Sequence, residues 1–248
     1  INGTQLMRRL VTFDKWMLPL SEAAAAEMMH TGTASRLLYS QDDQGVSRLY
    51  LFSDGEAYGA FQQATGDETT GQHFLTTAGA WVFHLPLDQF DAIEIDPASP
   101  WQISYRQEQF PALRAMADAV EVEQALVALR MGQAQPGMTA LVRNYAHYRL
   151  AVFDRGEGFA LALAPDDKGR ELAALFTAPD NFSAFLDEHK TRPDAGLLLQ
   201  LELAGPKLFA QLSQMQIDGL VFNCRGPARP VAFALPFASV VLEAKPGE

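Results

Sequence analysis

Hydrophobic residues recur along this chain with two spacings, and the two spacings alternate in a regular order. Apolar residues return every three or four positions over 3–11 and 120–131, which predicts two amphipathic helices. After each helix come short apolar runs separated by Asp- and Gly-rich turns, a pattern typical of β-strands joined in hairpins. The predicted strands lie at 74–77, 91–95, 101–105, 148–153, 159–164, 171–176, 197–203, 217–222 and 231–235. The other predicted helices lie at 54–63, 80–87, 179–189 and 206–216, and Ser21 caps a helical insertion at about 21–31.

The same series of elements occurs twice. A shift of 124 residues lays 41–61 on 165–185 without a gap, and seven positions are identical. Upstream, residues 6–10 are laid on 126–130. We therefore predict a tandem duplication, with one repeat over 1–120 and the other over 121–248. Because helices alternate with mostly antiparallel strands in each repeat, the predicted fold class is α+β, a duplicated mixed sheet with packed helices.

Two short motifs mark both repeats. A strand ending in Leu-Phe-Ser or Leu-Phe-Thr runs into an aromatic helix at 51–61 and 175–185, and a strand-turn segment, IDGLVFNCRGP, occupies 217–227. Their order resembles the SseB-like family (the SseB N-terminal domain), best over 149–243. The chain departs from the family pattern at Ala92, Asp96 and Cys224, where the family has Gly, Asn and Pro.

The resemblance implies a non-catalytic bacterial accessory or binding protein. It connects the chain, through the family's name, with serine sensitivity and type III secretion. It supplies no catalytic residues, and its motif residues are interpreted as turn formers.

Composition and charge narrow the classes of partner. The 248 residues are 48% hydrophobic and 20% charged, which excludes global disorder. The net charge of −11 disfavours binding to nucleic acid or to an anionic membrane surface. Residues 1–124 carry 7 basic and 17 acidic side chains, whereas the remainder carries 12 and 13. We expect an acidic face on the first repeat and a basic protein partner.

Several features point to a cytoplasmic protein without bound metal or cofactor. The lone cysteine, Cys224, rules out an intramolecular disulfide and any site built on several cysteines. No apolar run approaches eighteen residues, so we expect no membrane insertion. The first residues lack the basic-then-apolar pattern of a signal peptide. The five histidines form no pair at metal-binding spacing.

The chain also lacks the common catalytic motifs, so we predict no catalytic residues. It contains no GxSxG elbow, no phosphate-binding GxxxxGK[ST] loop and no HExxH. The acidic pairs at 42–43 and 166–167 are interpreted as turn caps. The candidate binding residues for a surface or groove are Trp81, Trp101, Tyr105, Asn223 and Arg225. Trp16 and Tyr145 are weighed with them, and core packing is the alternative for each aromatic residue.

Two other function classes stay open. One is an enzyme, a hydrolase or transferase, with a site around Cys224 in which Arg225 lowers the thiol pKa and His84 and Asp218 assist. The other is a secreted component of a secretion apparatus, which is disfavoured because no long coiled-coil or disordered segment occurs.

Overall fold

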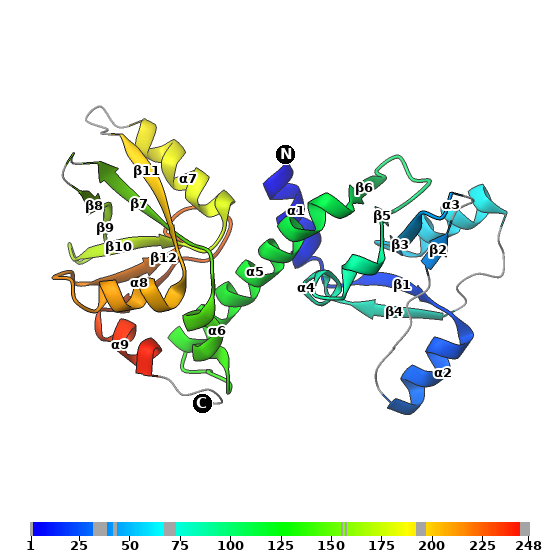
Figure 1. Ribbon diagram of the computed structural model, residues 1–248, viewed down its shortest axis with the longest axis horizontal. Coiled ribbons are helices and arrows are strands. Elements are labelled where there is room, and N and C mark those ends of the chain that lie inside the picture. Colours follow the sequence, from blue (N-terminus) through cyan, green and yellow to red (C-terminus); the bar gives the residue numbers. More distant parts are fainter. Residues whose placement is uncertain are drawn as a thin grey trace. The chain divides into compact units, whose positions relative to one another are not determined.

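The chain folds into two compact units. The computed structural model describes residues 2–31, 39–41, 44–66, 73–154, 156, 158–191 and 197–243 (Figure 1). The N-terminal unit is Leu6–Ala117, and the C-terminal unit is Asp118–Glu248 together with Ile1–Gln5. The division falls inside one long helix, α5 (Phe110–Arg130). The assignment of repeats to 1–120 and 121–248 stays a prediction.

The N-terminal unit combines a four-stranded sheet, a two-stranded ribbon and helices. The sheet has the order β2-β3-β5-β6, with β3 and β5 parallel, and the ribbon pairs β1 with β4. The bridge between Met17 and Phe52 joins the ribbon to the sheet. The elements are α1 (Gly3–Thr12), β1 (Trp16–Leu20), α2 (Glu22–Thr31), β2 (Tyr39–Gln41), β3 (Ser47–Leu51), α3 (Gly55–Thr65), β4 (His73–Thr77), α4 (Gly79–Phe83), η1 (Leu87–Gln89), β5 (Ala92–Ile95), β6 (Ile103–Arg106) and η2 (Gln107–Gln109).

The C-terminal unit is built on a larger sheet. Its order is β11-β7-β10-β12-β13, with β8 on β7 and β9 on β10, and β10 and β12 run parallel. The elements after α5 are α6 (Met138–Asn144), β7 (Tyr148–Asp154), β8 (Phe159–Leu161), β9 (Leu163–Pro165), β10 (Glu171–Phe176), α7 (Pro179–Lys190), β11 (Leu198–Leu203), α8 (Gly205–Leu212), β12 (Gly219–Phe222), β13 (Val231–Ala234) and α9 (Pro236–Glu243). Mixed, mostly antiparallel sheets with packed helices confirm the predicted α+β class.

The strand pairings of the two units correspond. In each unit a parallel pair has an antiparallel strand on its outer side, β6 on β5 and β13 on β12. The register of the parallel pair also matches, since Leu49 lies opposite Ile93 and Ala173 lies opposite Leu220. These are the positions that the sequence alignment equates. The tandem duplication itself stays our prediction.

A close approach of backbone segments recurs in both units. A Cβ atom on Gly79 would lie 2.1 Å from the carbonyl oxygen of Leu10, and one on Gly205 would lie 2.1 Å from that of Arg143. Only glycine fits at such a distance. The carbonyl belongs to α1 in one unit and to α6 in the other, so α1 corresponds to α6. Residues 6–10 therefore do not correspond to residues 126–130. The alignment of the two halves pairs these two segments, and this part of it is wrong.

Other differences from the predicted elements have local causes. The predicted strand over 159–164 is two strands, because the chain changes its partner from β7 to β10 at Ala162. The Ala162 N–H donates to the Ala151 carbonyl, and the Ala162 carbonyl accepts from the Ala174 N–H. The helix predicted over 120–131 begins earlier, at Phe110. The predicted cap at Ser21 is present, with Ala24 N–H donating to its hydroxyl at 3.2 Å. No helix among the described residues is long and apolar enough to cross a membrane.

Candidate functional site

A polar cluster closes the carboxyl end of the parallel pair in the C-terminal unit. Thr177 follows β10 and Asn223 follows β12. The Asn223 side chain accepts the Thr177 N–H at 3.0 Å and donates to the Thr177 hydroxyl at 3.0 Å. Asn223 has a φ of 52°, a left-handed conformation that asparagine tolerates better than most residues. Both side chains are buried, so their hydrogen bonds fix the two strand ends together.

Helix α5 covers this cluster with a carboxylate. Glu123 Oε1 accepts the Thr177 hydroxyl at 2.6 Å and the Asn181 side-chain amide at 2.9 Å. Asn181 lies in the first turn of α7 and is fully buried, and its side-chain oxygen accepts the Ala228 N–H at 3.1 Å. The donors of this strand end are therefore satisfied by an acceptor on a covering helix.

The same end of the N-terminal unit is acidic and partly exposed. Asp96, which corresponds to Asn223, accepts the Ser53 N–H at 2.7 Å, as Asn223 accepts that of Thr177. Asp54 caps α3 by accepting the backbone N–H groups of Glu56 and Ala57. Asp54 and Glu56 are exposed, whereas the Thr177 region of the other unit is buried. We call Asp54, Glu56 and Asp96 the acidic strand end.

The acidic strand end contains three of the acidic side chains that give the first half of the sequence its negative charge. None of its three carboxylates pairs with a basic side chain among the residues that the structure describes. By contrast, Glu94 in the same unit lies 3.9 Å from Arg48 and accepts the Ser104 hydroxyl. The predicted acidic turn at 42–43 lies outside the described residues.

The predicted binding residues are split between the surface and the interior. Trp81 on α4 is 44% exposed, and Trp101 in the loop before β6 is 81% exposed. Tyr105 and Asn223 are only 4% and 1% exposed, so neither is a surface residue. Arg225 is exposed, and its guanidinium is occupied by Glu188.

The other two aromatic candidates lie in the core. Trp16 donates from its ring nitrogen to the Leu10 carbonyl at 2.9 Å, and Tyr145 donates its hydroxyl to the Thr177 carbonyl at 2.5 Å. Both side chains are buried, which agrees with core packing as the alternative to a binding role. Burial also raises the pKa of Tyr145. The role of all five predicted residues in partner binding stays a prediction, and of these five only Trp81, Trp101 and Arg225 are exposed.

The environment of Cys224 does not activate its thiol. The side chain is 9% exposed and packs in an apolar cluster that includes Phe176 and Phe182. Burial raises the pKa of the Cys224 thiol to about 11, although the nearby Arg225 lowers it in part. A thiol with that pKa is almost entirely protonated at neutral pH, which weighs against the activated thiolate that the enzyme hypothesis needs.

Asp218, which belongs to the enzyme hypothesis, and Asp166, which was predicted as a turn cap, both make structural hydrogen bonds. Asp218 is exposed and accepts the Glu171 N–H at 2.9 Å, which joins the start of β12 to the start of β10. Asp166 accepts from Arg170 and holds the predicted turn, and hydrogen bonds from Arg170 lower the pKa of Asp166. His84 belongs to the N-terminal unit. The described part of the chain holds no group of three side chains that could bind a metal ion.

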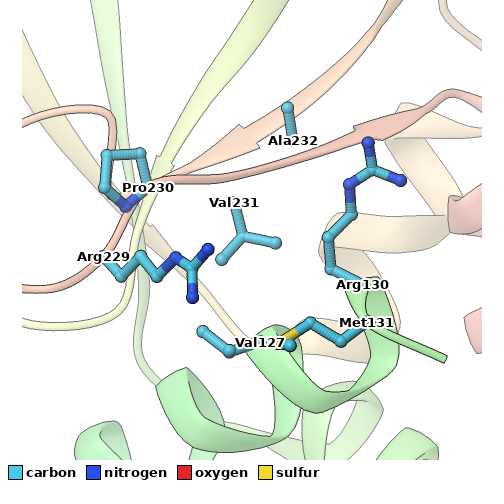
Figure 2. A pocket seen from close by; sticks show the side chains of 7 residues that line it. All are labelled: Val127, Arg130, Met131, Arg229, Pro230, Val231 and Ala232. Atoms are coloured by element: carbon cyan, nitrogen blue, oxygen red, sulfur yellow. The ribbon is translucent and has the colours of Figure 1, made fainter. Parts of the chain in front are cut away.

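A hollow with arginines at its edge lies within the C-terminal unit, where the end of α5 meets β13. Its volume is about 170 Å³. It is lined by Val127, Arg130, Met131, Arg229, Pro230, Val231 and Ala232. In Figure 2, Val231 lies between the two arginine side chains, with Val127 and Met131 below it. The hollow therefore combines an apolar floor with two cations.

Both arginines of the hollow differ from three others in the same unit. Arg149, Arg170 and Arg225 contact carboxylates in the same unit. Within the described residues, neither Arg130 nor Arg229 has a hydrogen-bond or ion-pair partner for its guanidinium. This site could not be predicted from the sequence, because its two sides are about a hundred residues apart and no local pattern connects them.

Comparisons with known proteins leave the chain without a family. No family model matches it, and no curated protein matches it in sequence. Among solved structures it is similar to one described as "Anabaena Tic22 (protein transport)". The identity is 11%, the alignment covers 87% of this chain and 88% of that chain, and the TM-score is 0.21.

Proposed function

We propose that this protein is a non-catalytic bacterial accessory protein of the SseB-like type, which binds a basic protein partner. The observation that carries the proposal is the contrast between two corresponding strand ends. In the C-terminal unit this end is covered by α5, and in the N-terminal unit it exposes Asp54 and Glu56. The acidic strand end is the surface to which we assign the partner.

The chemistry of this surface selects a basic partner. In the C-terminal unit, the covering Glu123 accepts hydrogen bonds because Thr177 and Asn181 offer donors. At the acidic strand end, Asp96 takes the place of Asn223, and Asp54 and Glu56 add two further acceptors. Burying unpaired carboxylates is costly, so a partner must bring lysine or arginine side chains to this end. The exposed Trp101, in the loop that follows Asp96, offers apolar area for the same partner.

The cellular setting belongs to the same proposal. The SseB-like resemblance over 149–243 supports a bacterial accessory role and carries the family's connection with type III secretion. A single reduced cysteine suits the cytoplasm, where thiols are kept reduced. We accordingly place the protein in the bacterial cytoplasm.

Neutralising the acidic strand end tests the proposal. The triple variant Asp54→Asn, Glu56→Gln and Asp96→Asn keeps the helix cap, because asparagine also caps helices, and it restores at 96 the residue of the other unit. The probe is a synthetic helical peptide in which turns of lysine residues alternate with turns of leucine residues. Its binding to the intact chain is measured by calorimetric titration. We expect the variant to bind it at least about tenfold more weakly, with the difference shrinking at high salt.

A matched variant controls for net charge. Asp154→Asn, Asp187→Asn and Glu243→Gln remove three exposed carboxylates from the C-terminal unit. This variant should bind the basic peptide as the parent chain does. Equal weakening in both variants would show that only the total charge matters, and the proposal would then be wrong.

A further inference from the structure

The hollow between α5 and β13 carries a second inference, independent of the acidic strand end. We propose that it binds an acidic peptide segment of another protein, with one apolar side chain of that segment inserted between Arg130 and Arg229. Three features of the hollow support this assignment: its size, its lining and the position of its strand in the sheet.

The size of the hollow favours a single side chain. Pockets for small molecules are commonly about 300–1,000 Å³. The volume here is about 170 Å³, too small to enclose a typical ligand of that kind. The buried Val231, with Val127 and Met131, provides an apolar surface against which one leucine-sized side chain can pack.

The charges at the edge select the flanking residues of the segment. Arg130 and Arg229 lie at opposite sides of Val231 in Figure 2. No carboxylate lines the hollow, and neither guanidinium is used elsewhere among the described residues. Arginine binds carboxylates with two parallel hydrogen bonds, so acidic residues on both sides of the inserted side chain complement this edge.

The position of β13 favours an extended peptide over a free anion. β13 is the outer strand of its sheet and pairs only with β12 among the described strands. An outer strand can pair with the backbone of an added segment, which supplies affinity that does not depend on sequence. A free anion would use the arginines but neither the apolar floor nor the strand.

Fluorescence anisotropy with defined peptides tests this inference on the intact chain. The probe is a short labelled peptide with one leucine flanked on both sides by glutamates. We expect saturable binding that Arg130→Glu or Arg229→Glu weakens at least about tenfold. Met131→Ala should weaken it severalfold, because one wall of the hollow is lost. The exposed Lys207 gives the control: Lys207→Glu changes the net charge equally and should leave binding within about twofold.

Two further probes separate the possible occupants. A peptide with serine in place of leucine should bind severalfold more weakly, and inorganic phosphate should compete poorly. If the serine peptide binds equally well and phosphate displaces it, the hollow is an anion site and the inference is wrong. Unchanged binding to the arginine variants would overturn it as well. The triple variant of the acidic strand end should bind the acidic peptide normally, so this inference and the proposed function can fail separately.

Discussion

Asn223 shows how much a single residue can and cannot reveal in the sequence. Its place in the strand-turn motif predicts local hydrogen bonding, and the structure shows those bonds to Thr177. Its burial could not be predicted, because the cover comes from Glu123, about a hundred residues earlier in the chain. The motif identifies the turn, whereas the environment of the turn depends on which helix packs over it.

Exchanging the two strand-end residues tests this dependence. Asn223→Asp removes the donor to the Thr177 hydroxyl and adds a buried charge near Glu123. We expect a loss of about 2–4 kcal/mol in unfolding free energy, measured by urea denaturation. Glu123→Gln in the Asn223→Asp background should recover part of this loss. The reverse exchange, Asp96→Asn, should change stability by less than about 1 kcal/mol, because Asp96 is partly exposed and asparagine can still accept the Ser53 N–H.

The Cys224 thiol predicts a particular pH dependence. Its pKa is raised to about 11 in the folded chain, against about 8.5 for a free thiol. The neutral thiol therefore stabilises the folded state below about pH 8.5, and this contribution is lost as the pH rises towards 11. Between pH 8 and pH 10 the unfolding free energy should fall less in the Cys224→Ala variant than in the parent chain. The difference between the two falls should be on the order of 1 kcal/mol or more. Equal slopes for both proteins would contradict the burial argument.

Reactivity gives a second measurement on the same group. In the native protein at neutral pH, Cys224 should react with a thiol reagent far more slowly than in the unfolded chain, because the native thiol is buried and protonated. A fast native reaction would restore the enzyme hypothesis, since it would require an accessible thiolate.

At the scale of elements, the glycines after β4 and β11 set how closely a helix can approach. The Gly79 N–H donates to Phe13 at 2.7 Å, and the Gly205 N–H donates to Tyr145 at 2.8 Å. Alternating patterns predicted most of the strands and helices from sequence. They missed β1, where Pro19 lies within an uninterrupted apolar run, and the helices α6 and α9. They also joined β8 and β9 into one strand over 159–164, where the chain changes its partner. β1 pairs with the distant strand β4, whereas β8 and β9 pair with different neighbouring strands, and periodicity encodes neither choice of partner.

Alanine substitutions separate the tight glycines from the others. Gly205→Ala should cost more than about 2 kcal/mol, because its Cβ would meet the backbone of Arg143. Gly59, in the middle of α3, has nothing within 4 Å of an added Cβ. Gly59→Ala should therefore stabilise the chain by about 0.5–1 kcal/mol. Thermal and urea unfolding measure both, and a neutral Gly205→Ala would show that the helix can move away.

At the scale of the whole molecule, the charge is less one-sided than the sequence halves suggest. Residues 6–117 carry 7 basic and 14 acidic side chains, a net charge of −7, against −4 for the C-terminal unit. The difference arises because Asp118, Glu121 and Glu123 belong to the C-terminal unit. The case for a basic partner therefore rests on where three carboxylates gather and not on the total.

The two-unit organisation predicts that a fragment can fold alone. Residues 118–248 contain their own sheet and the part of α5 that carries Glu123. This fragment should give a dispersed amide NMR spectrum and unfold cooperatively. A fragment that starts at 132 lacks the acceptor for Thr177 and Asn181 and should be less stable by several kcal/mol. An unfolded 118–248 fragment would show that the unit depends on the rest of the chain.

The outer position of β13 has a consequence for solubility. Unpaired strand edges invite pairing with the same edge of another copy, and natural proteins oppose this with charges beside the edge. Arg130 and Arg229 line the hollow at β13, and we expect their like charges to oppose such pairing. The two arginines that we propose to bind an acidic segment would thus also keep the protein from aggregating with itself. Neutralising both arginines should lower the highest concentration at which the protein stays monomeric.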